Sequence, residues 1–200
     1  SLTKNIPSEA GLGGGSSDAG FFLKLLNEHY GNVYNEKELE ELAMKVGSDV
    51  PFFIKNKTAR VGGKGNKVEL VENNLKDSLI LVKPLGFGVS TKDAYNSFDE
   101  LDEVRYSNFE KIVECLRNDN RKDLEKYIEN GLEQGISERN ADIKMFKAIL
   151  NSVVPGKKFF MSGSGSTYYT FVTELEKSQI ETRLKTFVDN VKIIICNTIN

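Results

Sequence analysis

The sequence predicts an α+β chain of two parts, and three observations support this. A glycine-rich loop leads into an amphipathic helix near the start of the chain. A second helix and two short strand-like segments follow, ending in a polar stretch at 73–77. Without its extra helices, the rest of the chain follows the order β-α-β-β-α-β of a ferredoxin-like domain. We therefore expect one domain over residues 1–76 and a second over residues 77–200.

The composition indicates a globular protein. The 200 residues are 39% hydrophobic and 28% charged, which is enough apolar material for a core. A net charge of −2, with no basic run, gives no reason to expect nucleic acid as a partner. No apolar run is long enough to span a bilayer, so we expect no membrane partner. The two distant cysteines, Cys115 and Cys196, suggest unpaired thiols in the cytoplasm.

The glycine-rich loop occupies residues 7–20 and predicts a binding site for phosphate. Its glycines free the backbone for conformations that other residues resist, and Ser16 and Ser17 follow at the start of the helix. Unpaired amide groups and the helix dipole favour an anion at such an N-terminus. A flexible linker has the same composition. It fits poorly, because the strand-like residues 2–6 precede this loop and a strongly patterned helix follows it.

The helix after the loop is predicted from apolar residues at a 3.6-residue period, ending at Gly31. Gly20 lies within it and lowers its helix propensity by roughly 1 kcal/mol. The apolar face contains Ala19, Phe22, Leu23, Leu26 and Tyr30.

Asp49 is the candidate general base. It follows a second helix, at 35–46, that Asn35 and Glu38 begin as a capping box. Pro51 predicts an extended segment after Asp49, which would hold the carboxylate toward a substrate hydroxyl. Alternatively, Asp49 only satisfies turn amides, as aspartate in loops usually does.

The other segments complete the two-part chain. Strands are predicted at 58–61, 67–71, 79–82, 157–161, 167–172 and 191–197, with glycine turns at 62–65 and 162–166. Helices are predicted at 107–116, 121–132, 140–150 and 175–188, the first with a capping box from Ser107 to Glu110.

The loop belongs to neither of two familiar nucleotide-binding motifs. No lysine precedes the serine pair, as the P-loop requires, and the βαβ unit of a Rossmann fold is missing. The loop instead resembles the ATP loop of the GHMP kinases, the family of galactokinase and the homoserine and mevalonate kinases. Further segments resemble motifs of that family in the same order, and these are 47–52, 88–91 with 94–95, 130–133 and 161–167.

This resemblance implies the GHMP kinase fold: part of an N-terminal domain like ribosomal protein S5 domain 2, and a ferredoxin-like C-terminal domain. The triple glycine with segment 47–52 resembles the branch that phosphorylates the 2-hydroxyl of 4-diphosphocytidyl-2-C-methyl-D-erythritol in non-mevalonate isoprenoid synthesis. The implied cofactors are ATP and Mg²⁺, with no metal site made by the protein alone. The implied partner is this small-molecule substrate, bound by a monomer or a weak homodimer.

The resemblance also assigns site residues. Asp49 is the implied catalytic base, and Tyr95 the implied aromatic that stacks on cytosine. Gly163, Ser164 and Gly165 are expected near the substrate phosphates, although a plain hairpin turn also explains them. ATP is expected at Pro7, Ser8, Glu9, Ala10, Gly11, Leu12, Gly13, Gly14, Gly15, Ser16 and Ser17.

The chain also departs from the family pattern. It begins with Ser1, and it lacks the family's Pro-Ala-Lys-Ile-Asn strand, whose lysine pairs with the catalytic aspartate. We therefore interpret it as the later two thirds of the enzyme and do not expect it to be active by itself. Two alternatives remain open: another GHMP small-molecule kinase, and a non-catalytic nucleotide-binding or metabolite-binding module.

Overall fold

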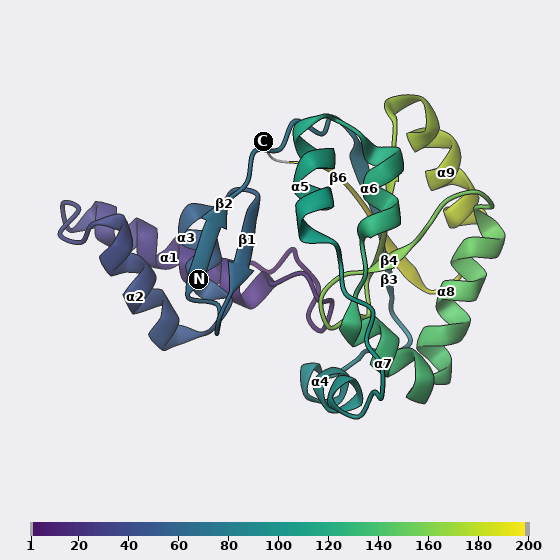
Figure 1. Cartoon of the computed structure of the whole chain (residues 1–200), viewed down its shortest axis with the longest axis horizontal. Helices are drawn as coiled ribbons and strands as arrows, with labels where there is room; N and C mark the ends of the chain where they lie inside the picture. The colour runs from purple at the N-terminus through teal and green to yellow at the C-terminus, as the bar shows by residue number, and fades with distance from the viewer. Residues whose placement is uncertain (1, 199–200) are drawn as a thin grey trace. The chain divides into compact units, whose positions relative to one another are not determined.

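The computed structural model describes residues 2–198 (Figure 1). The chain divides into two compact units, one of residues 13–73 and one of residues 2–12 with 74–198. The glycine-rich loop at residues 7–20 is therefore divided between the two units, because the boundary lies between residues 12 and 13. The domain boundary expected at residue 76 remains a prediction.

The unit of residues 13–73 has three helices and a hairpin among the residues described. Its buried apolar core is small and consists of Leu39, Ala43, Val50 and Ile54. The helices are α1 (Gly14–His29), α2 (Glu36–Val46) and α3 (Val50–Lys55), and the antiparallel strands are β1 (Ala59–Gly62) and β2 (Lys67–Leu70).

The predicted caps and faces of this unit are only partly correct. The capping box of α2 is confirmed, with Asn35 accepting from the Glu38 amide and Glu38 accepting from the Asn35 amide. The apolar face expected on α1 is wrong in part. Only Ala19 and Leu23 pack against the core, whereas Phe22 is 60% exposed.

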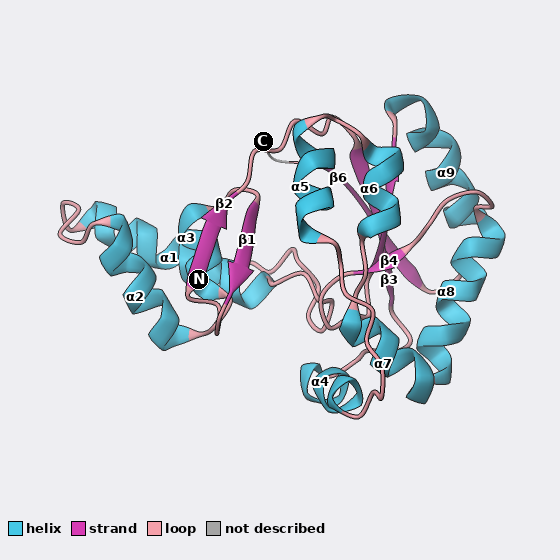
Figure 2. Ribbon diagram, viewed as in Figure 1, coloured by secondary structure: helices cyan, strands magenta, loops and turns pink. Residues whose placement is uncertain are grey.

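The larger unit is built on a four-stranded antiparallel sheet with the order β4-β5-β3-β6 (Figure 2). In chain order its strands are first β3 (Ser78–Pro84), then β4 (Phe160–Met161), β5 (Tyr168–Val172) and β6 (Val191–Asn197). This sheet order is that of a ferredoxin-like domain, as predicted. Its helices are α4 (Thr91–Asp99), α5 (Phe109–Arg117), α6 (Arg121–Tyr127), α7 (Gly131–Arg139), α8 (Ala141–Val153) and α9 (Glu174–Phe187).

Helices cover both faces of this sheet. Ile80 and Val82 of β3 share a core with α8 and α9. Leu79, which points to the opposite face, packs with Cys115 of α5 and Leu124 of α6. In Figure 1, α5 and α6 lie in front of the strands, and α8 and α9 form the edge of the unit.

Several expected elements differ from the structure. Residues 2–6 belong to no described strand, and the Asn5 carbonyl instead accepts a hydrogen bond from Lys192 (3.2 Å). The helix expected at 121–132 is broken at 128–130, because Asn130 begins a new helix by accepting from the Glu133 amide.

Other differences are smaller. Asn108, not Ser107, caps α5, and the Ser107 hydroxyl pairs with the Glu129 backbone instead. Helix α4 was not predicted, although Ser90 caps it. The strand expected at 157–161 is only two residues long. Within residues 2–198, no helix is both long and apolar enough to cross a membrane.

Candidate functional site

The second half of the glycine loop forms an uncapped helix N-terminus. Gly13 precedes α1 in the left-handed region (φ 63°), and no described side chain caps the helix. Its first turn also lacks an acidic residue, whereas α2 and α9 have capping boxes with glutamates. Gly15 is exposed, and a Cβ atom added there would meet no other atom within 4 Å. The first turn of α1 is therefore free to accept an anion.

Asp49 lies at the N-cap of α3, not before a strand. The extended segment expected after it is wrong, because residues 50–55 form a helix with Pro51 in its first turn. Proline is tolerated there, since its missing N–H group has no partner in the first turn of a helix. The exposed Asp49 side chain makes no capping hydrogen bond.

Helix α3 packs closely on α1 through Phe53. A Cβ atom at Gly20 would lie 2.7 Å from the Phe53 Cβ, and one at Gly13 would lie 2.9 Å from its ring. Lys24 of α1 donates to the Ile54 carbonyl of α3 (3.1 Å). These contacts fix the helix that begins at Asp49 against the helix that begins after Gly13.

Gly65 is a further supporting position that the sequence did not single out for the site. A Cβ atom there would lie 1.9 Å from the Ser48 carbonyl oxygen. The hairpin turn thus lies directly on the backbone that precedes Asp49. A signal was present, because Gly65 belongs to a glycine-rich turn.

The first half of the glycine loop, residues 7–12, lies on residues 161–167, the second glycine motif, within the larger unit. The Ser162 hydroxyl donates to the Gly11 carbonyl (2.8 Å), and the Ser166 amide donates to the Glu9 carbonyl (3.4 Å). A Cβ atom at Gly11 would lie 1.9 Å from the Ser162 carbonyl oxygen, and one at Gly163 would lie 2.9 Å from the Gly11 carbonyl oxygen. Glycine permits this close backbone contact.

Asn130 and Glu133 hold the second glycine motif from the other side. The Asn130 amide donates to the carbonyls of Met161 (2.8 Å) and Gly163 (2.9 Å). The buried Glu133 carboxylate accepts from the Met161 amide (3.1 Å) and forms an ion pair with Lys147. Burial raises the pKa of the nearby Tyr169 phenol to about 12, and the Glu133 charge adds to the effect.

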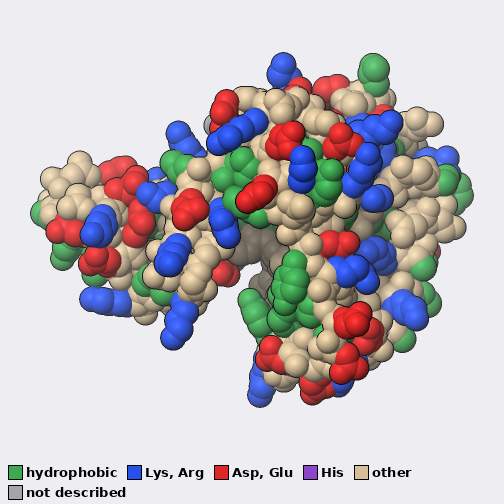
Figure 3. All heavy atoms as spheres, viewed as in Figure 1, with side chains coloured by type: hydrophobic (Ala, Val, Ile, Leu, Met, Phe, Trp, Pro, Cys, Tyr) green, Lys and Arg blue, Asp and Glu red, His purple; other side chains and the backbone are tan. Residues whose placement is uncertain are grey.

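A cavity of about 510 Å³ lies beside this motif. Tyr95, on α4, and Gly163 both line it, so two residues predicted from sequence meet in one place. Ser164 is within 3.2 Å of the Thr91 hydroxyl, at the start of the same helix. Figure 3 shows hydrophobic side chains gathered beside α4 on the face in view.

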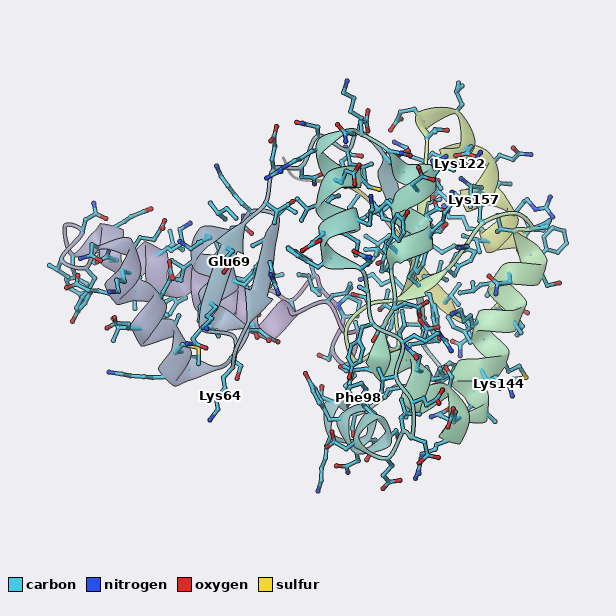
Figure 4. The ribbon with its side chains drawn as sticks, viewed as in Figure 1. Lys64, Glu69, Phe98, Lys122, Lys144 and Lys157 are labelled. Atoms are coloured by element: carbon cyan, nitrogen blue, oxygen red, sulfur yellow. The ribbon has the colours of Figure 1, made fainter. Side chains whose placement is uncertain are left out.

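The same cavity contains residues that the sequence did not assign to a site. Phe98 and Tyr106 line it with Asn130. Phe98, labelled in Figure 4, comes from α4 and contacts α7, where a Cβ atom at Gly131 would lie 2.5 Å from its ring. The Asn130 motif was a usable signal, whereas nothing local distinguished Tyr106.

The described residues contain no cluster of three or more histidine, cysteine or acidic side chains suited to a metal ion. The Ser17 hydroxyl donates to the Gly14 carbonyl (2.8 Å), and its oxygen keeps its lone pairs.

Residues 1–57 match the family model of the GHMP kinases N terminal domain. The chain is 80% identical over 199 residues to a 4-diphosphocytidyl-2-C-methyl-D-erythritol kinase of Fusobacterium nucleatum. It is 36% identical over 185 residues to the kinase of the same name from Clostridium botulinum (strain Loch Maree / Type A3). These matches cover 100% and 90% of this chain, and the chain spans 68% and 63% of the two relatives.

The chain also matches solved structures of kinases. A 4-(cytidine 5'-diphospho)-2C-methyl-D-erythritol kinase matches with a TM-score of 0.75 and 26% identity, over 97% of this chain and 69% of that one. A homoserine kinase from Cytophaga hutchinsonii matches with a TM-score of 0.73 over 99% of this chain and 68% of that one. At 18% identity, the second likeness concerns the fold alone.

Proposed function

Because this chain belongs to the GHMP kinases, and among them to the 4-diphosphocytidyl-2-C-methyl-D-erythritol kinases, we propose that it phosphorylates the 2-hydroxyl of that compound with ATP. The 80% identity to a relative of that name, over the whole chain, is the observation that carries the proposal. The product belongs to the non-mevalonate route to isoprenoids. We place the reaction in the cytoplasm, in a monomer or a weak homodimer.

ATP phosphates are assigned to the loop at 7–17. The uncapped first turn of α1 supports this, since its amides and dipole favour negative charge. Exposed Gly15 leaves room for a phosphate to approach the backbone. Bound ATP would supply the phosphoryl group, and Mg²⁺ would neutralise its charge with the Ser16 and Ser17 hydroxyls nearby.

The substrate is assigned to the cavity beside the second glycine motif. Tyr95 is 54% exposed, which leaves its ring face available for stacking on a planar base such as cytosine. Gly163, Ser164 and Gly165 are assigned to the diphosphate. Gly163 and Gly165 have positive φ values of 53° and 84°, so this turn can bring backbone amides close to an anion.

Asp49 is assigned as the general base that accepts the proton of the substrate hydroxyl. Its carboxylate is exposed and makes no capping bond, so it remains available to a ligand. The helix that it begins is fixed by contacts with Gly13 and Gly20. A positioned base of this kind contributes roughly 10²- to 10⁴-fold to the rate.

The test is Asp49→Asn in the full-length protein. We expect turnover to fall by about 10²- to 10⁴-fold, while ATP binding measured by calorimetry is kept. The matched control is Asp142→Asn, another exposed aspartate at the start of a helix, which should keep its turnover. Unchanged turnover in Asp49→Asn would exclude the proposed base.

The substrate is tested by a coupled assay with several alcohols. We expect phosphorylation of 4-diphosphocytidyl-2-C-methyl-D-erythritol and none of mevalonate, phosphomevalonate or homoserine. Activity on one of the latter alone would identify another GHMP kinase. Nucleotide binding without turnover on any of them would favour a non-catalytic module.

A further inference from the structure

Lys83, near the end of β3, is a buried cation to which the proposed function gives no role. Lys83 is only 6% exposed. Among residues 2–198, no carboxylate lies within 4.0 Å of the Lys83 ammonium nitrogen, the distance that an ion pair requires. The hydrogen bonds of this nitrogen go to neutral groups. Burial of an ammonium group without a carboxylate partner is unfavourable and calls for a specific reason.

The ammonium group joins two turns. Its Nζ donates to the Ser166 hydroxyl (2.6 Å) and to the Phe87 carbonyl (3.4 Å). Ser166 is fully buried, and its hydroxyl lies 3.5 Å from the same carbonyl. Lys83 therefore holds the end of the second glycine motif against the turn that precedes α4.

Glu9 lies on these same two turns. Its carbonyl accepts from the Ser166 amide (3.4 Å), and a Cβ atom at Gly88 would lie 2.8 Å from its carboxylate. Glu9 also has a left-handed backbone (φ 50°), which a residue with a side chain keeps only when its surroundings hold it. The two turns that Lys83 joins are thus the turns that contact Glu9.

The charges explain why a lysine is useful here. A carboxylate in a loop that receives phosphates repels them unless a cation offsets its charge. Burial lowers the pKa of Lys83, and the Glu9 charge acts in the opposite direction. Lys192 is a second cation, directly opposite Lys83 on β6, and its ammonium group donates to the Asn5 carbonyl instead.

We propose that Lys83 is a positioning residue for the ATP loop, which fixes Ser166 and Phe87 beneath Glu9 and offsets the Glu9 charge so that phosphates can bind. The inference rests on the proposed function, because it assumes that the loop receives the phosphates of a nucleoside triphosphate. Lys83 acts through the loop and makes no contact with the reacting atoms.

The affinity for nucleotide tests whether the positive charge of Lys83 supports phosphate binding. We expect Lys83→Met to weaken the binding of Mg²⁺ and a non-hydrolysable ATP analogue by about tenfold, measured by calorimetry. Lys192→Met, which removes the paired lysine from the neighbouring strand, should change this affinity less than about threefold. Equal losses in the two variants would overturn the proposal.

A double variant distinguishes an electrostatic role of Lys83 from a purely structural one. Removal of the unopposed carboxylate in Lys83→Met/Glu9→Gln should recover most of the lost affinity. A purely structural lysine would give no recovery, and that result contradicts the proposal. An unmodified chain that does not bind the analogue contradicts the proposed function instead.

An experiment without nucleotide covers the case in which Lys83→Met fails to fold. The Lys83 Cε resonance, in protein labelled with ¹³C-lysine, is followed by NMR through an alkaline titration. Glu9→Gln, at an exposed residue, should move the midpoint to lower pH, because the carboxylate that favours the ammonium form is gone. An unmoved midpoint would show that the two charges do not interact, and the proposal would fail.

Discussion

Single glycines determine how closely the backbone segments of the candidate site approach one another. At Gly11 and Gly65, a methyl group would lie 1.9 Å from a carbonyl oxygen of another segment. Gly11 was expected in the ATP loop for its flexibility, whereas the structure shows a close contact with Ser162. The glycines of these motifs are therefore needed for packing as well as for conformation.

Gly65→Ala is expected to destabilise the unit of residues 13–73 by about 2–4 kcal/mol. The added methyl group would meet the Ser48 carbonyl, and φ at this glycine is +92°. Urea unfolding measures the change. The control is Gly31→Ala, where φ is +85° but nothing lies within 4 Å, so strain alone should cost about 1–2 kcal/mol. Similar losses in both variants would mean that the contact with Ser48 has no importance.

At the scale of elements, helix propensity alone gives the wrong reason for Gly20. By propensity, this glycine only weakens α1. In the structure it allows α3 to pack against α1, since a Cβ atom would lie 2.7 Å from Phe53. Similarly, Pro51 suggested an extended segment, but it lies in the first turn of α3, where proline is tolerated.

The start of α9 provides a pH-dependent contribution to stability. Burial raises the pKa of Glu176, but hydrogen bonds from Lys157 and Thr173 outweigh this and lower it from 4.5 to about 2. Lys157 reaches the carboxylate from the loop before β4 (2.8 Å) and is labelled in Figure 4. A depressed carboxylate pKa stabilises the fold above pH 4.5, and this stabilisation is lost as the pH falls toward 2.

Glu176→Gln should therefore lower the free energy of unfolding at pH 7 by about 1–2 kcal/mol, a value reduced because the side chain is partly exposed. The difference from the unmodified protein should shrink as the pH falls from 4.5 to 3. Urea unfolding at three pH values measures it. Glu181→Gln, on the same helix, should keep the unmodified pH dependence. A constant difference between Glu176→Gln and the unmodified protein would contradict the assigned pKa.

At the scale of the whole molecule, the two units differ in the size of their cores. The unit of residues 13–73 buries four apolar side chains in its cluster, whereas the larger unit has two clusters on the two faces of its sheet. Less buried apolar area gives a lower free energy of local unfolding. The smaller unit should therefore open more easily.

Amide hydrogen exchange tests this difference. Amides of α2 and α3 should exchange with a lower opening free energy than amides of β3 and β5. Ile54→Ala, which creates a cavity in the smaller core, should accelerate exchange within 13–73 and leave β5 unchanged. Equal protection in both units, or acceleration in both, would show that they open together.

Local patterns in the sequence predicted most elements and the main motifs. The capping box of α2 and the hairpin of β1 and β2 depend on caps and turns, which are local properties. The sequential order of strands and helices predicted the ferredoxin-like sheet of the larger unit. The resemblance of the glycine motifs predicted the kinase family, which an 80% identical relative confirmed. The assigned roles of Asp49 and Tyr95 remain predictions.

Contacts between distant segments were decided only by the tertiary structure. Gly11 meets Ser162 across most of the chain, Lys83 meets Ser166, and Gly65 meets Ser48. Such contacts depend on which side chains the packing brings together, and spacing along the chain does not encode that. The sequence determined the chemistry available to the loop, whereas packing determined which groups hold it in place.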